Sequence, residues 1–378
     1  MRILVSGGGT GGHIYPALSV AQALRERYGA ELLFIGDENG LETRIVPQAG
    51  IPFATIQAGK LRRYLSAGTF TDLARVPVGM AQALGHVRRF RPDAAFTSGG
   101  YVAVPAGVAA RICGASLVMH QQDVSPNLAN RLLTPVATRI SVSFEPSLAY
   151  FPRRKTALAG NPVRGPILAM MGADPVALKH LFNFDPALPL LLVTGGSQGA
   201  RHLNQVVTEA LPWLLPVCQV LHVSGQLTHE ETRARAEAQL VNDPTGGQLV
   251  KRYRLYPYLD EQMPAALAAS DIVLCRSGAA TLAELAVLGR PSLLVPLPPG
   301  FSGSPQQVNA EMFVRAGAAA MVLDKDLTAE RLRGLLQPLL ADRLRLGQMG
   351  AAARTMARPN AAAVLADAVA ELAKRRAR

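Results

Sequence analysis

Aromatic side chains and cysteines are both scarce in this sequence. Only 5% of the 378 residues are Phe, Tyr or Trp, so the hydrophobic interior must be built from Leu, Val, Ala and Ile. The three cysteines, Cys113, Cys218 and Cys275, are far apart and odd in number. They therefore form neither a disulfide framework nor a metal-binding spacing. This usage of cysteine favours a reduced, cytoplasmic compartment.

Long hydrophobic runs are also missing. No stretch approaches the roughly 20 apolar residues of a transmembrane helix, so any contact with a membrane would be peripheral. The apolar run at the N-terminus is short and ends in glycines, so we expect no signal peptide. With 378 residues, the chain is long for a single hydrophobic core and suits two domains.

Acidic residues are outnumbered, with 27 Asp and Glu against 39 Lys and Arg and a net charge of +12. Such an excess indicates an anionic partner, namely nucleic acid, a membrane surface or a phosphorylated substrate, unless it is a general basic bias of the source proteome. Half of the net charge lies in residues 60–91, which contain one acid, Asp72. The seven basic residues there are Lys60, Arg62, Arg63, Arg75, Arg88, Arg89 and Arg91.

A glycine-rich stretch near the N-terminus suggests a ligand site. Residues 2–6 are mostly apolar, residues 7–12 contain five glycines, and helix-compatible sequence begins at Pro16. A buried strand that runs through a glycine turn into a helix leaves free N–H groups for an anion. Residues 190–200 repeat this plan. The repeat predicts two similar domains that face each other.

Strand-like and helix-like segments alternate along the whole chain. The predicted strands are residues 2–6, 31–36, 53–56, 94–97, 116–120 and 139–143, then 190–194, 217–224, 249–253, 272–275, 292–296 and 319–323. This alternation predicts an α/β fold with doubly wound parallel sheets and ligands at the carboxyl ends of the strands. Turn residues at 160–166 predict a hinge, and the chain is expected to be helical from Thr328.

Residues 70–90 form an amphipathic segment with arginines beside its apolar face, and Pro77 should kink or split it. The pattern fits an ordinary surface helix and a basic helix at an anionic lipid surface equally well.

The two glycine loops match no standard nucleotide motif well. Neither is a P-loop, because no Gly-Lys-Ser/Thr follows. Gly7, Gly9 and Gly12 match the dinucleotide fingerprint formally, but Glu31 begins the second strand and no ribose-binding acid ends it.

Residues 275–284 are more specific. A strand ends at Cys275, and a Ser-Gly turn opens a helix whose first N–H groups suit a diphosphate. Glu284 is then either a surface acid or an acceptor for a ribose diol. Gln306, Gln307 and Asn309 either bind a sugar or simply begin a helix.

Five motifs together resemble the MurG family of glycosyltransferases, and the likeness spans nearly the whole chain. They are Gly8-Gly9-Thr10-Gly11-Gly12-His13, Thr97-Ser98-Gly99-Gly100-Tyr101, Gly160-Asn161-Pro162-Val163-Arg164, Gly195-Gly196-Ser197-Gln198-Gly199-Ala200 and Arg276-Ser277-Gly278-Ala279. The family transfers N-acetylglucosamine from UDP-N-acetylglucosamine (UDP-GlcNAc) to undecaprenyl-diphosphate-linked muramoyl-pentapeptide (lipid I), giving lipid II of peptidoglycan synthesis.

The resemblance implies a GT-B fold, in which two Rossmann-like domains flank a cleft. Residues 1–160 would bind the acceptor and face the membrane, residues 161–345 would bind UDP-GlcNAc, and residues 346–378 would cross back to the first domain. It implies one set of substrate-binding residues: Thr10, Gly11, Gly12, Arg164, Ser197, Leu259, Ala279, Ala280, Thr281, Glu284 and Gln306. Among these, the Leu259 backbone would bind uracil, Glu284 the ribose and Gln306 the sugar hydroxyls.

The resemblance also implies a mechanism. His13 would be the general base for attack by the muramoyl 4-hydroxyl with inversion, unless it is a structural histidine that caps its loop. Asp123 is the second candidate for the base. No carboxylate cluster has a metal-binding pattern, so we expect no metal and no cofactor. Helix N-termini and Arg164 would stabilise the leaving UDP instead.

The implied partners are UDP-GlcNAc, lipid I and an anionic membrane surface. Other cell-wall synthesis proteins are further candidate partners, and nucleic acid is not expected to bind. The location would be peripheral, at the cytoplasmic face of the plasma membrane. The expected membrane contacts are Arg62, Arg63, Phe70, Leu73, Arg75, Met80, Leu84, Arg88 and Arg89.

This sequence departs from the common family pattern at three positions. Gln121 stands where many members have Glu, Asp123 where they have Asn, and Pro305 where they have His. Three alternatives to this family also fit parts of the pattern. They are another GT-B enzyme, such as a diacylglycerol glycosyltransferase or a nucleotide-sugar epimerase, a tandem Rossmann oxidoreductase, and a basic nucleic-acid-binding protein. The missing ribose acid and the low aromatic content argue against the last two.

Overall fold

Two parallel β-sheets organise the chain in the computed structural model, which describes residues 1–59, 67–196, 199–241, 247, 249–298 and 305–376, with the backbone alone for 67–74. The first sheet has the order β3 (Phe53–Ile56), β2 (Glu31–Asp37), β1 (Arg2–Ser6), β4 (Ala94–Thr97), β5 (Ser116–Gln121), β6 (Arg139–Val142), β7 (Thr156–Leu158). The second has the order β10 (Tyr253–Tyr256), β9 (Gln219–Val223), β8 (Leu190–Thr194), β11 (Ile272–Cys275), β12 (Ser292–Leu294), β13 (Ala319–Met321).

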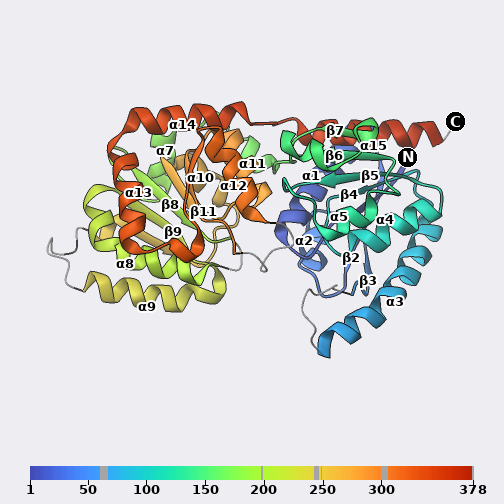
Figure 1. Cartoon of the computed structure of the whole chain (residues 1–378), viewed down its shortest axis with the longest axis horizontal. Coiled ribbons are helices and arrows are strands. Elements are labelled where there is room, and N and C mark those ends of the chain that lie inside the picture. The colour runs from blue at the N-terminus through green and yellow to red at the C-terminus, as the bar shows by residue number, and fades with distance from the viewer. Residues whose placement is uncertain (60–66, 197–198, 242–246, 248, 299–304, 377–378) are drawn as a thin grey trace. The chain divides into compact units, whose positions relative to one another are not determined.

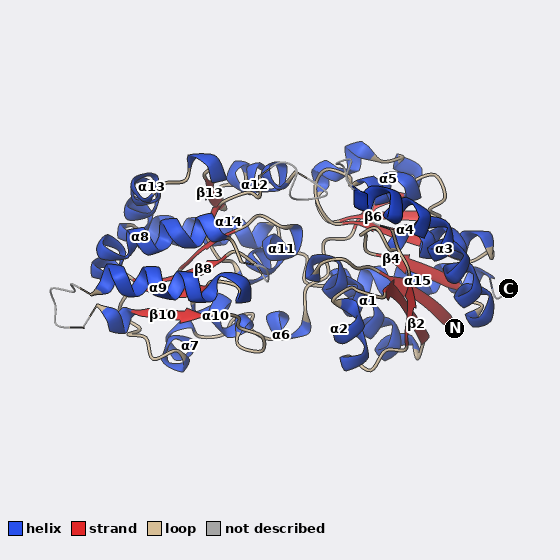
Figure 2. Cartoon of the chain, turned by 90° about the horizontal axis from the view of Figure 1, so that it is seen from below, coloured by secondary structure: helices blue, strands red, loops and turns tan. Residues whose placement is uncertain are grey.

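Helices flank the strands of each sheet (Figure 2). With the first sheet lie α1 (Gly11–Tyr28), α2 (Glu42–Gln48), α3 (Ala67–Phe90), α4 (Ala103–Ile112), α5 (Leu128–Leu133) and α15 (Ala361–Arg376). With the second lie α6 (Gly165–Leu168), α7 (Pro175–Leu181), α8 (Arg201–Val217), α9 (His229–Leu240), α10 (Met263–Ala269), α11 (Ala279–Leu288), α12 (Gln306–Arg315), α13 (Ala329–Ala341) and α14 (Arg343–Thr355). The predicted doubly wound α/β fold is thus confirmed.

The two sheets belong to two compact units with their own cores. Residues 1–164 and 358–378 form the first unit, and residues 165–357 form the second. Strand β8 is buried along its whole length because helices cover both faces of its sheet, which explains its continuous apolar sequence. The core of the second unit joins this sheet to α8 and α13 through Leu211, Leu274 and Leu336.

The C-terminal helix α15 packs in the first unit, so both ends of the chain lie there (Figure 1). Leu365 and Val369 belong to the same buried cluster as Ile3 and Val5 of β1. At the rim, both guanidinium nitrogens of Arg139 bind the Glu371 carboxylate, at 2.6 and 3.0 Å. Burial of the apolar face stabilises this docking more than the half-exposed ion pair does.

Several predicted boundaries differ from the structure. The strand predicted at 249–253 is wrong, because Val250–Arg252 is a 3-10 turn and β10 follows it. Pro77 lies inside α3 and does not split it. The predicted boundary at 346 falls inside α14, which packs in the second unit, and the return to the first unit begins at Arg358. Strand β7 and helix α2 were not predicted, and β2 ends on an acid, Asp37, where none was expected from the sequence.

None of the helices within the described part of the chain is both long and apolar enough to cross a membrane.

Candidate functional site

The glycine motifs lie where the strand order of each sheet reverses. In the first sheet this switch lies between β1 and β4, and in the second between β8 and β11. Loop 7–10 follows β1 and loop 98–102 follows β4, whereas 195–200 follows β8 and 276–278 follows β11. Doubly wound sheets bind ligands in the crevice that opens at this point. Four of the five sequence motifs therefore lie in neighbouring loops, two of them in the first unit and two in the second.

The two loops of the first pair touch closely enough to require glycine. A Cβ on Gly7 would lie 2.0 Å from Ser98 Oγ, and a Cβ on Gly100, whose φ is 86°, would lie 2.3 Å from the Gly8 carbonyl oxygen. Ser98 Oγ also donates to the His13 carbonyl at 2.6 Å. These contacts hold the start of α1 against the loop after β4.

His13 lies in the first turn of α1, with Nδ1 3.1 Å from the Ser98 carbonyl oxygen. Gln122 Nε2 donates to that same carbonyl at 2.7 Å and also lies 3.1 Å from His13 Nδ1. If Nδ1–H donates to Ser98, the lone pair is on Nε2. If Gln122 donates to Nδ1, the proton is on Nε2. Only the first arrangement leaves Nε2 able to accept a proton.

Burial lowers the pKa of His13 below its ordinary value. The negative charge of Asp123 opposes this shift most, followed by the Ser98 carbonyl and the Glu42 carboxylate. At neutral pH His13 is therefore uncharged, which is the form that a general base requires. The structure thus brings His13 and Asp123, both expected near the reacting hydroxyl, into one electrostatic environment.

Glu42 is a site residue that sequence reasoning missed. Its carboxylate is fully buried and accepts the N–H groups of Gly9, at 3.3 Å, and Asp37, at 3.0 Å. A Cβ on Gly8 or Gly40 would lie within 2.4 Å of this side chain, so the glycines make room for it. The only sequence signal is an acid among glycines after the second strand, and that signal does not show what the acid contacts.

His120 and Gln121, at the end of β5, are structural. Burial lowers the pKa of His120 to about 4, and its two ring nitrogens lie 3.1 Å from Ser141 Oγ and 3.1 Å from Asn161 Oδ1. Gln121 Nε2 donates to the carbonyls of Asp123, at 2.7 Å, and Ser125, at 3.0 Å. An ionised Glu cannot donate these bonds, so Gln121 suits the loop that carries Asp123.

Arg164 lies in the first unit, although the sequence reasoning placed it in the second domain. Its guanidinium lies over the Tyr15 ring of α1, 5.0 Å from the ring centroid. The Thr10 side chain is exposed and makes no capping hydrogen bond to α1. Thr10, Gly11, Gly12, His13 and Arg164 therefore gather around one helix start.

In the second unit, Ser277 joins the start of α11 to the start of α12. Ser277 Oγ donates to the Gln306 carbonyl at 2.9 Å, and Asn309 Nδ2 donates to the Ser277 carbonyl at 3.1 Å. Gln306 Oε1 accepts the Leu297 N–H at 3.1 Å, and a Cβ on Gly278 would lie 3.6 Å from Gln306 Nε2. The amide of Gln306 is thus held beside the N-terminus of α11.

That N-terminus is open to an anion. Gly278 is the N-cap, and no described side chain caps the helix ahead of Ala279, Ala280 and Thr281. Glu284 lies half-buried in the same helix, and Leu259 is buried. Ser197 lies outside the described residues.

Arg276 belongs to one of the sequence motifs, but its guanidinium is bound by other groups of the protein. Its Nη1 binds Asp324 Oδ1 at 2.6 Å and the Val295 carbonyl at 3.2 Å.

The expected membrane contacts fall on α3 and the segment before it. Arg75, Arg88 and Arg89 are exposed, and Met80 and Leu84 are half-buried, with Leu84 packed against the core. Val76 and Val78, which were not singled out in the sequence, are 37% and 44% exposed. Arg62 and Arg63 and the side chains of Phe70 and Leu73 lie outside the described residues.

Comparisons with known proteins agree across both units. Residues 3–142 match the glycosyltransferase family 28 N-terminal domain, and residues 190–365 match the glycosyltransferase family 28 C-terminal domain. A UDP-N-acetylglucosamine–N-acetylmuramyl-(pentapeptide) pyrophosphoryl-undecaprenol N-acetylglucosamine transferase of Desulforudis audaxviator is 38% identical over 377 residues, 99% of each chain. A protein of the same name from Exiguobacterium sibiricum is 37% identical over 379 residues, 100% of each chain. The crystal structure of Acinetobacter baumannii MurG has a TM-score of 0.75 at 27% identity, covering 98% of this chain and 99% of that one.

Proposed function

We propose that this chain, which belongs to the family of UDP-N-acetylglucosamine–N-acetylmuramyl-(pentapeptide) pyrophosphoryl-undecaprenol N-acetylglucosamine transferases, converts lipid I to lipid II. It moves N-acetylglucosamine from UDP-GlcNAc to the muramoyl 4-hydroxyl. The observation that carries this conclusion is 38% identity over 99% of both chains. The chain is thus a hexosyltransferase of peptidoglycan synthesis with a GT-B fold.

The proposed donor site lies in the second unit. The N–H groups at the start of α11, from Ala279 to Thr281, would receive the diphosphate, where the helix dipole favours negative charge. Glu284 would accept hydrogen bonds from the ribose hydroxyls, and the Gln306 amide beside Gly278 would bind the sugar. The Leu259 backbone would bind uracil. The role of Ser197 rests on its motif alone.

The proposed acceptor site lies in the first unit, around Thr10, Gly11 and Gly12. The muramoyl 4-hydroxyl attacks the anomeric carbon of N-acetylglucosamine, and the bond from that carbon to the UDP oxygen breaks with inversion. The hydroxyl proton passes to Nε2 of His13, and UDP leaves with the bonding electrons. Arg164 contributes positive charge beside the start of α1. Asp123 is the alternative base.

Binding to the membrane is proposed to be peripheral, at the cytoplasmic face of the plasma membrane. Helix α3 carries the exposed cations Arg75, Arg88 and Arg89 together with the exposed Val76 and Val78, a combination that suits an anionic lipid surface. Other cell-wall synthesis proteins are further proposed partners.

The reaction is proposed to need no metal ion. The test is transfer of labelled N-acetylglucosamine from UDP-GlcNAc to a short-chain lipid I analogue, with and without EDTA, and with diacylglycerol as a control acceptor. We expect transfer to lipid I alone and an unchanged rate after chelation. Loss of transfer on chelation would overturn the metal-free mechanism. Protection against heat by UDP-GlcNAc without transfer would retain the donor site and reject the acceptor.

A further inference from the structure

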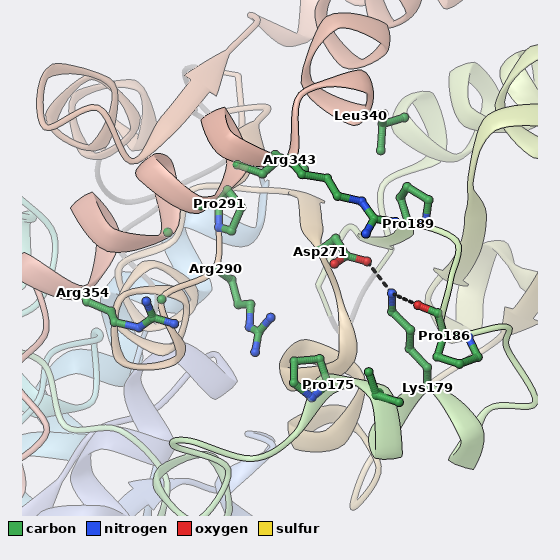
Figure 3. A pocket seen from close by; sticks show the side chains of 15 residues that line it. Pro175, Lys179, Pro186, Pro189, Asp271, Arg290, Pro291, Leu340, Arg343 and Arg354 are labelled. Atoms are coloured by element: carbon green, nitrogen blue, oxygen red, sulfur yellow. Dashed lines mark hydrogen bonds and ion pairs between the residues drawn. The ribbon is translucent and has the colours of Figure 1, made fainter.

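Figure 3 shows the residues that line a cavity in the second unit, whose volume is about 400 Å³. The cavity lies at the opposite edge of the sheet from the proposed donor site. Pro189, Asp271 and Pro291 line it, and each immediately precedes a strand, namely β8, β11 and β12. The donor loops follow β8 and β11 instead. Because a strand of four or five residues spans roughly 15 Å, the cavity and the donor loops are separate sites.

The cavity wall carries an excess of positive charge. Lys179, Arg290, Arg343 and Arg354 line it, and Asp271 is the only acid among the lining residues. The Asp271 carboxylate has two partners of its own, because it pairs with Lys179 Nζ at 2.7 Å and accepts the Leu190 N–H at 2.8 Å. Within the described ranges, no carboxylate forms an ion pair with any of the three arginines.

Arg290 is the most constrained of these cations. Its Nη1 donates to the Ser270 carbonyl at 2.9 Å, and its buried Nε has no hydrogen-bond partner among the described residues. Burial lowers the pKa of Arg290, Asp271 opposes the shift, and the positive charge of Arg354 adds to it. In Figure 3 the Arg290 side chain extends between Arg354 and the Lys179–Asp271 pair. A bound anion would relieve the repulsion between the two guanidinium groups.

Arg354 is positioned by close packing. Gly289, which ends α11 with a φ of 61°, lies so close that a Cβ there would be 2.3 Å from Arg354 Nε. No described residue accepts a hydrogen bond from the Arg354 guanidinium, whereas Arg343 Nη2 donates to the Ala187 carbonyl at 2.8 Å. Arg290 follows the end of α11, whereas Arg343 begins α14 and Arg354 lies near its end. The three arginines thus reach the cavity from three helix ends.

We propose that this cavity binds a ligand with a phosphate or diphosphate group, held by Arg290, Arg343 and Arg354. Planar guanidinium groups match phosphate oxygens in pairs, and an ammonium ion does not. Four prolines in the wall, Pro175, Pro186, Pro189 and Pro291, make it rigid and preformed. Its volume lies in the range of small-molecule sites, so a phosphorylated molecule fits it better than a lone ion.

The test is calorimetric titration of inorganic pyrophosphate into the full-length protein saturated with UDP, so that the donor site is already occupied. We expect one pyrophosphate to bind the wild type. Arg354→Gln should weaken this binding about tenfold, because one charge-assisted contact is lost. Arg345→Gln is the matched control, because it removes the same charge from an exposed position of α14 outside the cavity lining. It should change the affinity by less than about twofold.

Arg354→Gln breaks no hydrogen bond between described residues, so we expect this variant to fold. Arg290→Gln, which loses the bond to Ser270, should weaken binding at least as much if circular dichroism shows that it is folded. Absence of pyrophosphate binding to the wild type, or equal affinities of the Arg354 and Arg345 variants, would overturn the proposal. UDP binding is measured in a separate first titration, so its failure would count against the donor site alone.

Two sources of the phosphate are distinguished by flotation with phosphatidylglycerol vesicles. Weaker flotation of Arg354→Gln than of Arg345→Gln assigns the cavity to a phospholipid headgroup. Equal flotation of the two variants, with pyrophosphate binding weakened in Arg354→Gln, assigns it to a soluble phosphorylated molecule.

Discussion

The ring of His13 shows how a few contacts decide what a residue can do. Its Nδ1 lies at the same distance, 3.1 Å, from an acceptor on Ser98 and a donor on Gln122. The proposed base needs the tautomer with the proton on Nδ1, and the Ser98 carbonyl is the group that favours it. Burial keeps the ring uncharged, so the same environment sets both the tautomer and the charge.

Replacing His13 tests the proposed base directly. His13→Ala should lower kcat about 10²- to 10⁴-fold, the usual contribution of a general base, while heat protection by UDP stays unchanged. In the wild type, the acid limb of the kcat/KM profile should lie below pH 6.5, because burial lowers the pKa of His13 and the neutral ring is the active form. His180→Ala, at an exposed position of α7, is the control. Undiminished turnover of His13→Ala would remove this residue from the role.

Asp123→Asn separates the two candidate bases. The negative charge of Asp123 raises the pKa of His13, so its removal should move the acid limb to still lower pH. The rate at neutral pH should then change by less than about threefold, because His13 already accepts the proton. The pH profile of the rate is the measurement. A fall in kcat of about 100-fold or more with an unmoved limb would assign the base to Asp123 instead.

At the scale of an element, the loop between β1 and α1 depends on a side chain from α2. Glu42→Ala should lower the free energy of unfolding by about 2–4 kcal/mol, because the buried N–H of Asp37 and the part-buried N–H of Gly9 lose their acceptor and a cavity remains. Urea unfolding measures this loss. Glu38→Ala, at an exposed position just after β2, should stay within about 0.5 kcal/mol of the wild type. Equal stabilities of the two variants would show that Glu42 does not support the loop.

Helix α3 carries the prediction about the membrane. Reversing two charges with Arg88→Glu and Arg89→Glu should weaken binding to anionic vesicles by more than about 30-fold at low salt. Each cation near such a surface contributes about 1 kcal/mol. Vesicle co-sedimentation is the measurement. The double variant Arg331→Glu, Arg333→Glu makes the same change on exposed positions of α13 in the second unit. If both double variants bind alike, α3 is an ordinary surface helix.

For the whole molecule, each unit buries a neutral histidine, and this makes stability depend on pH. Burial lowers the pKa of His120 in the first unit to about 4 and that of His222 in the second to about 3. The unfolded chain binds a proton at each site below about pH 6.5, whereas the folded chain does not. The stabilising effect of the neutral state is therefore full above pH 6.5 and is lost progressively as the pH falls.

When the pH falls from 7 to 4.5, the free energy of unfolding should decrease by about 2–3 kcal/mol for each of these histidines. Urea unfolding across this range measures the slope for the first unit and its change in His120→Gln. That variant keeps a polar group but cannot titrate, so its slope should be flatter. An unchanged slope would show that His120 does not govern the loss of stability in acid.

The prediction from sequence succeeded where structure is local. The strand at residues 2–6 and the glycine turn after it lie within a dozen residues, so their pattern could be predicted without knowledge of the fold. Helix α1 begins at Gly11, earlier than the predicted start at Pro16. Contacts between residues far apart in the sequence could not be predicted. Arg276 belongs to an anion-site motif in the sequence, but Asp324, 48 residues later, binds its guanidinium. The strand predicted at 249–253 lies three to four residues further on, because a 3-10 turn takes up its start.

The amino-acid sequence by itself determined the α/β class, the paired strand–glycine–helix units and the motifs that mark the family, because each depends on neighbours along the chain. Only the tertiary structure decided that Glu42 supports the first glycine loop, that Arg164 lies on Tyr15, and that three arginines share a cavity with Lys179 and Asp271. Those arrangements join residues tens to hundreds of positions apart. No local periodicity encodes them, because close packing of the finished fold sets which distant side chains meet.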